Sequence, residues 1–398
     1  TPFEKVKQEN ETIAKRPPTI QFGSVREDEV YAPGKQAEKV RNTSIPVDVI
    51  NLDEINLYDP VNGVADLVNY GTTGINTTQN GSPGNISTIR IRGWNRALLT
   101  IDGMRASDPA FNATNIEDFN SFGVERVEVL RGAQGTMYGT LANGGLVAMK
   151  TRQGKGRPTF TLDAGFGNNG TFRESLEFDA GNSRADIYLG FQRLDTNGGA
   201  LTRFFNGDFD SKNDAYFSNT AVGNIGVRFL NNKAELRNIT RYINSKKEIG
   251  IEAVMPNNTP VFDPDSRSYN DKFINKTVFS HSPADFYDYD FSLGIFENQY
   301  KLLDNDIFFG FPINNYYKTN NTRLLFQTKH NFKVGDINTF TVGYDLENNS
   351  FREKTSGFSD SILKNGVYVY DSLNIKDIFF LRGGTRTTSR SEEHTSEL

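Results

Sequence analysis

The chain contains no cysteine, so neither disulfide bonds nor thiolate metal sites can hold it together. Its three histidines, His281, His330 and His394, are far apart in the sequence, which favours ordinary loop or surface positions over a metal site. No Ser/His/Asp order and no pair of carboxylates with a catalytic spacing can be recognised. The sequence therefore predicts neither an enzyme nor a bound cofactor or metal.

Long apolar runs are missing too. None approaches the roughly 20 consecutive apolar residues that a membrane-spanning helix requires, which excludes a helical membrane protein. The net charge of −5 over 398 residues gives no basic footprint for binding a nucleic acid. What the chain does have is 31 Phe, 16 Tyr and 36 Gly, a composition that suits long strands with aromatic side chains on one surface.

The two ends of the chain differ from the rest. Residues 1–26 are polar, include Pro17-Pro18, and are expected to form a flexible arm. Thr1 is not Met and no apolar signal core follows it, as in a signal-cleaved chain or a fragment. Residues 390–398 read RSEEHTSEL, which we interpret as a translated sequencing adapter and exclude from fold prediction. A natural polar tail is the alternative.

The sequence pattern of residues 27–153 predicts a small α+β domain. The alternation from Ile45 to Ile50 indicates a first strand. Asp53 to Tyr70 is expected to form one or two helical turns with an apolar stripe. Further strands are expected at Ile86 to Ile91, Leu98 to Ile101, Val124 to Leu130 and Leu146 to Thr151.

Residues 154–389 alternate between polar and apolar side chains over long segments. In Thr159 to Gly167, for example, Phe160 and Phe166 fall on the same face of the predicted strand. Several segments run to about ten residues, the length that a tilted strand needs to cross a bilayer. We count roughly nine to twelve such strands, mainly antiparallel, and expect the polar stretches 195–220 and 244–286 to be extracellular loops. A soluble sandwich also alternates, but with strands of about five or six residues.

Three segments between Ile89 and Thr151 carry a family resemblance: IRIRG, ALLTIDGMR and VERVEVLRGAQGTMYGTLANGGLVAMKT. Their order and spacing resemble the plug domain of TonB-dependent outer-membrane receptors. The resemblance implies an α+β plug followed by a transmembrane barrel of about 22 strands. An open sheet cannot complete a barrel in lipid, because unpaired backbone groups are too costly there. We therefore expect a C-terminally truncated fragment that supplies about half of such a barrel in the bacterial cell outer membrane.

Two arginines match the family pattern. Arg92 in IRIRG and Arg131 in VLRG resemble arginines that anchor the plug to carboxylates on the barrel wall. A planar guanidinium binds a carboxylate in a bidentate contact, which is stronger in a partly dry lumen than at a surface. A solvated arginine at a strand end is the alternative for each.

The glycines of these segments are expected to shape turns, since no Lys-Ser/Thr ending indicates a phosphate-binding loop. The chain departs from the family twice: Ala133 stands where proline is usual, and LVAM follows two glycines where the family often has a GVINI-like run. The predicted turn residues are Gly93, Asp102, Gly103, Gly132, Gly135, Gly139, Gly144 and Gly145.

The resemblance also implies a TonB box, a short extended segment near the N-terminus that pairs with TonB by strand addition. The preferred candidate consists of Glu29, Val30, Tyr31, Ala32 and Pro33, and the second is Thr19 to Val25. An ordinary linker strand fits either segment equally well. The implied partners are TonB with ExbB and ExbD in the periplasm, the lipid of the outer membrane, and an external ligand.

Contacts with that ligand are expected from plug loops. Trp94 is the single tryptophan and is followed by Asn95 and Arg96, a set suited to stacking and hydrogen bonding; Arg105 follows in a later loop. The resemblance implies import of a scarce nutrient, with a ferric siderophore as the default. Haem, cobalamin or an oligosaccharide stay open. A surface adhesin or recognition barrel without transport, and a soluble all-β carbohydrate-binding protein, are the alternatives.

Overall fold

A computed structural model describes residues 29–32, 35, 38–40, 43, 45–52, 63–72, 75–79, 84, 87–93, 97–106, 116, 118–139, 142, 144–199, 215–254, 260–308, 311–335, 337–375 and 378–396. Its first part contains β1 (Glu29–Val30), β2 (Glu38–Lys39), β3 (Val47–Asn51), α3 (Val64–Gly71), β4 (Ile75–Gln79), β5 (Ser87–Ile91), β6 (Leu98–Ile101), β7 (Met104–Arg105), β8 (Val124–Arg131), α4 (Gly135–Tyr138) and β9 (Gly145–Thr151). Its second part contains β10 (Thr159–Gly167), β11 (Thr171–Gly181), β12 (Ala185–Thr196), β13 (Tyr216–Phe229), β14 (Ala234–Val254), β15 (Pro260–Ala284), β16 (Tyr287–Phe308), β17 (Phe311–Val334), β18 (Asn338–Glu353), β19 (Phe358–Ile375) and β20 (Phe379–Ser396).

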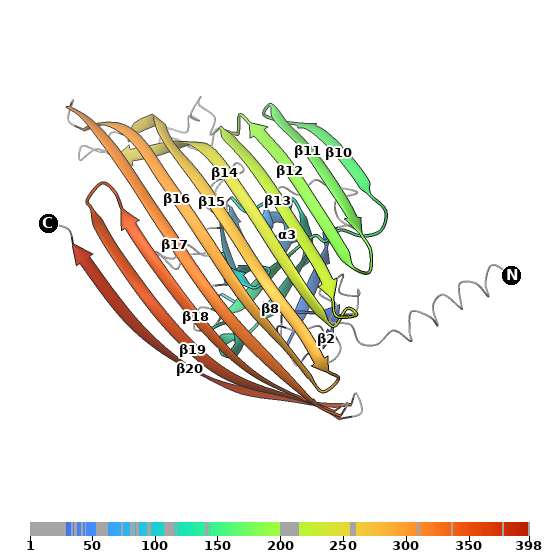
Figure 1. The fold of residues 1–398 in the computed structure, drawn as a ribbon. Helices are drawn as coiled ribbons and strands as arrows, with labels where there is room; N and C mark the ends of the chain where they lie inside the picture. The colour runs from blue at the N-terminus through green and yellow to red at the C-terminus, as the bar shows by residue number, and fades with distance from the viewer. Residues whose placement is uncertain are drawn as a thin grey trace.

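These parts form two structures that lie against each other. The described residues from 29 to 151 form an α+β unit, which we call the plug, and β10 to β20 form one curved sheet, which we call the wall. The plug lies behind the long strands of the wall in Figure 1, within their curve. The predicted fold class, an α+β unit followed by antiparallel barrel strands, is confirmed.

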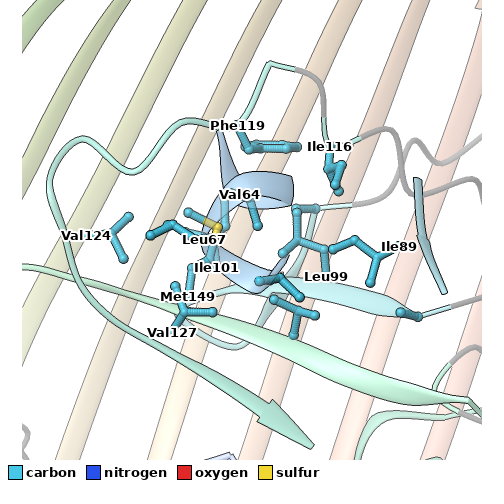
Figure 2. Packing of buried hydrophobic residues seen from close by; sticks show 14 of the residues in the cluster. Val64, Leu67, Ile89, Leu99, Ile101, Ile116, Phe119, Val124, Val127 and Met149 are labelled. Carbon is cyan, nitrogen blue, oxygen red and sulfur yellow. The ribbon is translucent and has the colours of Figure 1, made fainter. Parts of the chain in front are cut away.

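The plug is built on a sheet of five described strands in the order β3-β8-β9-β6-β7. Strands β6 and β9 are parallel, and the other neighbours are antiparallel. Helix α3 buries Val64, Leu67 and Val68 because they share one face, as the apolar stripe predicts. Figure 2 shows Val64 and Leu67 packed among Leu99, Ile101 and other side chains of this core.

The wall is a meander in which each of its 11 described strands pairs with the next one in sequence. Its outer face carries apolar side chains such as Phe160, Leu162 and Leu293, while its inner face carries polar ones or contacts the plug. One prediction is wrong here. Residues 244–286 are not mainly a loop, because β14 continues to Val254 and β15 runs from Pro260 to Ala284. The buried face of these strands carries polar side chains such as Ser245, Ser268 and Lys272, so the sequence shows little polar–apolar alternation there.

The two ends of the wall differ in their connections. At one end the strands are joined by the short turns 182–184, 230–233, 285–286, 335–337 and 376–378, and we call this the short-turn end. At the opposite end the connections are 168–170, 197–215, 255–259, 309–310 and 354–357, and of these only 197–215, between β12 and β13, is long.

Among the described residues, no helix combines the length and the apolar character needed to span a membrane.

Candidate functional site

An apolar row on the wall continues the core of the plug. Ile243, Ile274, Phe296 and Leu325 lie on four adjacent strands, β14 to β17, and belong to the same buried cluster as α3 and the plug sheet. The wall also makes room for one plug side chain at Gly294, where an added Cβ would lie 2.7 Å from Met104 Sδ. Along this row, the interface between plug and wall is therefore packed like a protein interior.

A buried ion pair joins the plug to β15. The Asp118 carboxylate contacts the Lys272 ammonium, and their side chains are only 2% and 6% exposed. Asp118 Oδ1 also accepts hydrogen bonds from Ser245 Oγ at 2.8 Å and from the Tyr216 hydroxyl at 3.4 Å. Three wall strands thus converge on one plug carboxylate.

A second set of charges joins the plug to β17 and β18. The Arg105 guanidinium lies 3.5 Å from the Glu347 carboxylate and donates a hydrogen bond of 2.6 Å to the carbonyl of Tyr138. Arg323 on β17 donates to the carbonyl of Arg105 at 2.8 Å. Lys276 on β15 donates to the carbonyl of Asp102 at 2.8 Å, which holds the Asp102-Gly103 turn against the wall.

The N-terminal segment of the plug is docked across β8. We call its described residues 29–32 and 35 the strap. The backbone N–H groups of Tyr31 and Ala32 donate to the Glu128 carboxylate at 2.9 Å and 2.7 Å. The Arg126 guanidinium, 2.6 Å from Glu128, donates to the carbonyl of Glu29 at 2.9 Å. As a result Val30 and Ala32 are fully buried.

The strap also contacts the wall. Lys329 on β17 donates to the carbonyl of Lys35 at 2.6 Å and pairs with Asp290 at 2.8 Å. The Lys35 ammonium lies over two tyrosine rings, 5.0 Å from the Tyr138 centroid and 5.1 Å from the Tyr368 centroid. Since Tyr138 belongs to the plug and Tyr368 to β19, Lys35 is clamped between the two structures.

Replacement of Glu128 tests the docking of the strap. We expect Glu128→Ala to release residues 29–32, because it removes the acceptor of two backbone N–H groups and leaves Arg126 buried without its carboxylate. Hydrogen exchange of the Tyr31 and Ala32 amides should accelerate by roughly 100-fold or more. Glu125→Ala is the control on the same strand, since Glu125 pairs with the half-exposed Lys155 instead. Unchanged exchange in Glu128→Ala would show that the strap is held by other contacts.

Burial shifts the pKa values of the groups around the strap. It lowers the pKa of Lys35 to about 8, although part of this side chain remains accessible, and it raises the pKa of Tyr31 and Tyr138. The charged groups that act on Lys35 are Asp345, Arg386, Lys276 and Lys329. Asp345 opposes the shift, and the three cations add to it.

This shift gives a pH dependence of strap docking. Between about pH 8 and the ordinary lysine pKa of 10.5, the released strap binds more protons than the docked strap, so raising the pH in this window favours docking. The equilibrium constant for docking can rise by at most about tenfold per pH unit. A spin label on Glu29→Cys, selective because the chain has no other cysteine, should show a growing immobile fraction from pH 8 to 10. The same titration with Lys35→Met should be flat, and a parallel response in both proteins would refute this assignment.

The two arginines predicted to anchor the plug lie in different surroundings. Arg131 pairs with Asp48 inside the plug at 2.8 Å, and Arg92 is an exposed residue with φ 51°. Their anchoring role stays a prediction. Trp94, Asn95, Arg96 and Pro33 lie outside the described residues.

Among the predicted turn residues, two form a tight hairpin turn and one glycine has no space for a side chain. Asp102 and Gly103 join β6 to β7 with φ values of 49° and 80°, as a two-residue hairpin turn requires. Gly145 has φ 151° and leaves no space for a side chain. Gly93, Gly132 and Gly139 also have positive φ, whereas Gly135 begins α4 and Gly144 precedes β9.

Sequence reasoning missed several residues that join the plug to the wall. Asp118 carried no recognisable motif, and Lys272 lay in a stretch that was predicted to be a loop. Arg105, which was predicted to bind ligand, contacts Glu347 and Tyr138 in this structure, and its role toward a ligand stays a prediction. Among the described residues, no group of three or more His, Asp or Glu side chains could hold a metal ion.

Comparison with known proteins adds a family match. Residues 39–146 match the model of the TonB-dependent Receptor Plug Domain family. A stretch of 98 residues is 32% identical to the vitamin B12 transporter BtuB of Vibrio cholerae, which covers 24% of this chain and 16% of that protein. The chain therefore matches only a small part of this curated relative.

Solved structures with the same fold include two receptors. The pyoverdine outer membrane receptor FpvA from Pseudomonas aeruginosa is 13% identical with a TM-score of 0.74, over 95% of this chain and 61% of that one. The open form of the ferric-catecholate import receptor Fiu from E. coli is 15% identical with a TM-score of 0.68, over 90% of this chain and 61% of that one. At such identities the likeness shows the fold alone, and the chain spans about three fifths of these structures.

Proposed function

Because this chain belongs to the TonB-dependent receptors of the bacterial outer membrane, we propose that it is the plug and part of the wall of an importer for a scarce nutrient. The single observation that carries the proposal is a plug packed against the inner face of a barrel wall, with a docked strap at its N-terminal side. The proteins that it resembles are named as transporters and receptors, which supports the prediction that it is not an enzyme.

We infer the orientation from the connections of the wall. Barrels of the outer membrane have short turns in the periplasm and longer loops outside. The short-turn end then faces the periplasm, and the strap is within reach of a periplasmic partner. The strap begins with the preferred TonB-box candidate, so TonB, energised by ExbB and ExbD, would pair with residues 29–33 after these leave Glu128.

The cargo is most simply a ferric siderophore. FpvA and Fiu, whose fold the chain shares, are named as receptors for pyoverdine and ferric catecholates, whereas BtuB is named as a vitamin B12 transporter. These names support a metal-chelate cargo without selecting one chelator. Trp94, Asn95, Arg96 and Arg105 remain the proposed ligand contacts.

Growth on defined nutrient sources tests the import proposal. Loss of the full-length gene should abolish growth on one ferric siderophore, haem, cobalamin or glycan source, and removal of residues 29–35 alone should abolish uptake while ligand binding persists. Persistent binding with no uptake phenotype in either strain would favour the adhesin. Normal uptake without residues 29–35 would place the TonB box elsewhere, and Thr19 to Val25 would then be tested in the same way.

A further inference from the structure

Two cavities lie between the plug and the wall at different heights. The first has a volume of 130 Å³ and is bordered by Ser280 and Asp290 near the 285–286 turn, so it lies toward the short-turn end. The second has a volume of 290 Å³ and is bordered by Asp345 and Glu347, midway along β18. We call them the lower cavity and the middle cavity.

The two cavities meet at a few side chains. Lys35, Gly103, Tyr138 and Gln327 line both of them. Gly103 has no side chain, Gln327 donates a hydrogen bond to Asp345 at 2.9 Å, and the Tyr138 hydroxyl donates to the carbonyl of Ala32 at 2.9 Å. Lys35 is the strap residue in this set, and the described contacts of its ammonium are the two ring faces of Tyr138 and Tyr368. Its side chain is therefore the easiest of the four to withdraw.

The middle cavity carries an excess of positive charge. Without Arg390, which belongs to the segment interpreted as a translated adapter, its lining contains two carboxylates, Asp345 and Glu347, and four cations: Lys35, Arg105, Lys364 and Arg386. Glu347 alone is shared by three cations, with Arg105 and Lys364 at 3.5 Å and Arg323 at 3.7 Å. A narrow space with low-dielectric walls and such an imbalance concentrates anions.

We propose that the two cavities are parts of one passage for anionic solutes along the β17 to β20 side of the plug, and that Lys35 closes it. Release of the strap from Glu128 withdraws Lys35 from between Tyr138 and Tyr368 and joins the cavities. The inference deepens the import proposal, since it names the route and the charge of the cargo group. The inference depends on the import proposal only for the identity of the solute that passes through.

Ion conductance of the purified full-length protein in planar bilayers tests this assignment without any cargo. The wild-type protein should be closed. Lys35→Ala should produce conductance steps, and Lys35→Ala combined with Tyr368→Ala should produce larger ones, because the second change removes a ring that could fill the vacated space. In a KCl gradient the reversal potential should shift toward that of chloride.

Lys301→Ala is the matched control. Lys301 also lies over two tyrosine rings, 5.3 Å from Tyr269 and 5.7 Å from Tyr316, but it lines neither cavity, so this variant should stay closed.

Closed Lys35 variants with a folded plug would overturn the proposal, as would cation-selective steps or equal opening by Lys301→Ala. Conductance without growth on any nutrient would refute import and leave the passage standing. Uptake without conductance would refute the passage alone.

Discussion

Replacing Lys272 with methionine will loosen the plug by about 3–5 kcal/mol, because it leaves the Asp118 carboxylate buried without its counter-charge. Ser245 and Tyr216 remain as hydrogen-bond donors, but neither carries a charge. A single cysteine at the buried position Ile116, in an otherwise cysteine-free chain, reports opening through its labelling rate. We expect that rate to rise by about two to four orders of magnitude.

Two controls separate this effect from the loss of any lysine or any buried charge. Lys246→Met removes a partly exposed lysine that lies 4.0 Å from Glu248, and it should change the opening free energy by less than about 1 kcal/mol. Arg241→Met removes a fully buried guanidinium that has no hydrogen-bond partner among the described residues, so it should be neutral or stabilising. Equal labelling rates in Lys272→Met and Lys246→Met would mean that the buried pair does not hold the plug.

Gly145→Ala will disrupt the plug sheet. At this position φ is 151°, and an added Cβ would lie 2.5 Å from the Leu130 carbonyl oxygen and 2.6 Å from Ile91 Cδ1. Neither the carbonyl of β8 nor the buried Ile91 can move without disturbing its neighbours. Backbone strain and overpacking together should cost about 3–5 kcal/mol. Hydrogen exchange of the β8 and β9 amides should accelerate accordingly.

Gly132→Ala isolates the contribution of the backbone. Gly132 also has a positive φ, 126°, but nothing lies within 4 Å of the Cβ that it would carry. Its replacement should therefore cost only the strain, about 1–3 kcal/mol. If both variants accelerate exchange equally, the contact with Leu130 and Ile91 contributes nothing and the argument from packing is wrong.

The local pattern of apolar, polar and turn residues was sufficient to predict most strands of the plug. Leu98–Ile101 begins and ends where the sequence indicates, because an apolar run stopped by Asp-Gly has few other structures available. The face of β8 that carries Arg126 and Glu128 is different. Alternation suggests that this face is open to water, yet both residues are only 3% exposed, because the strap covers them. Burial by a distant polar segment leaves no periodic signal in the strand itself.

The contacts between plug and wall were beyond the reach of sequence patterns. Asp118 and Lys272 are 154 residues apart, and nothing local to either indicates the other. The stretch 244–286 was misjudged for a related reason. Polar–apolar alternation indicates a strand only where the buried face is apolar. In β14 and β15 the buried face itself carries polar side chains such as Ser245, Ser268 and Lys272, so the alternation is lost although the backbone pairing continues.

The apolar row of Ile243, Ile274, Phe296 and Leu325 makes seating of the plug an all-or-none event. Charged residues adjoin this belt on the same strands, since Arg241 is paired across from Ile274 and Arg323 from Phe296. A strand advances only about 3.3 Å per residue. Side chains on one face are two residues apart, so a plug displaced by about 6.6 Å along these strands would set hydrocarbon against the guanidinium of Arg241 or Arg323 and lose the apolar contact. The seated height of the plug against this part of the wall is therefore sharply defined.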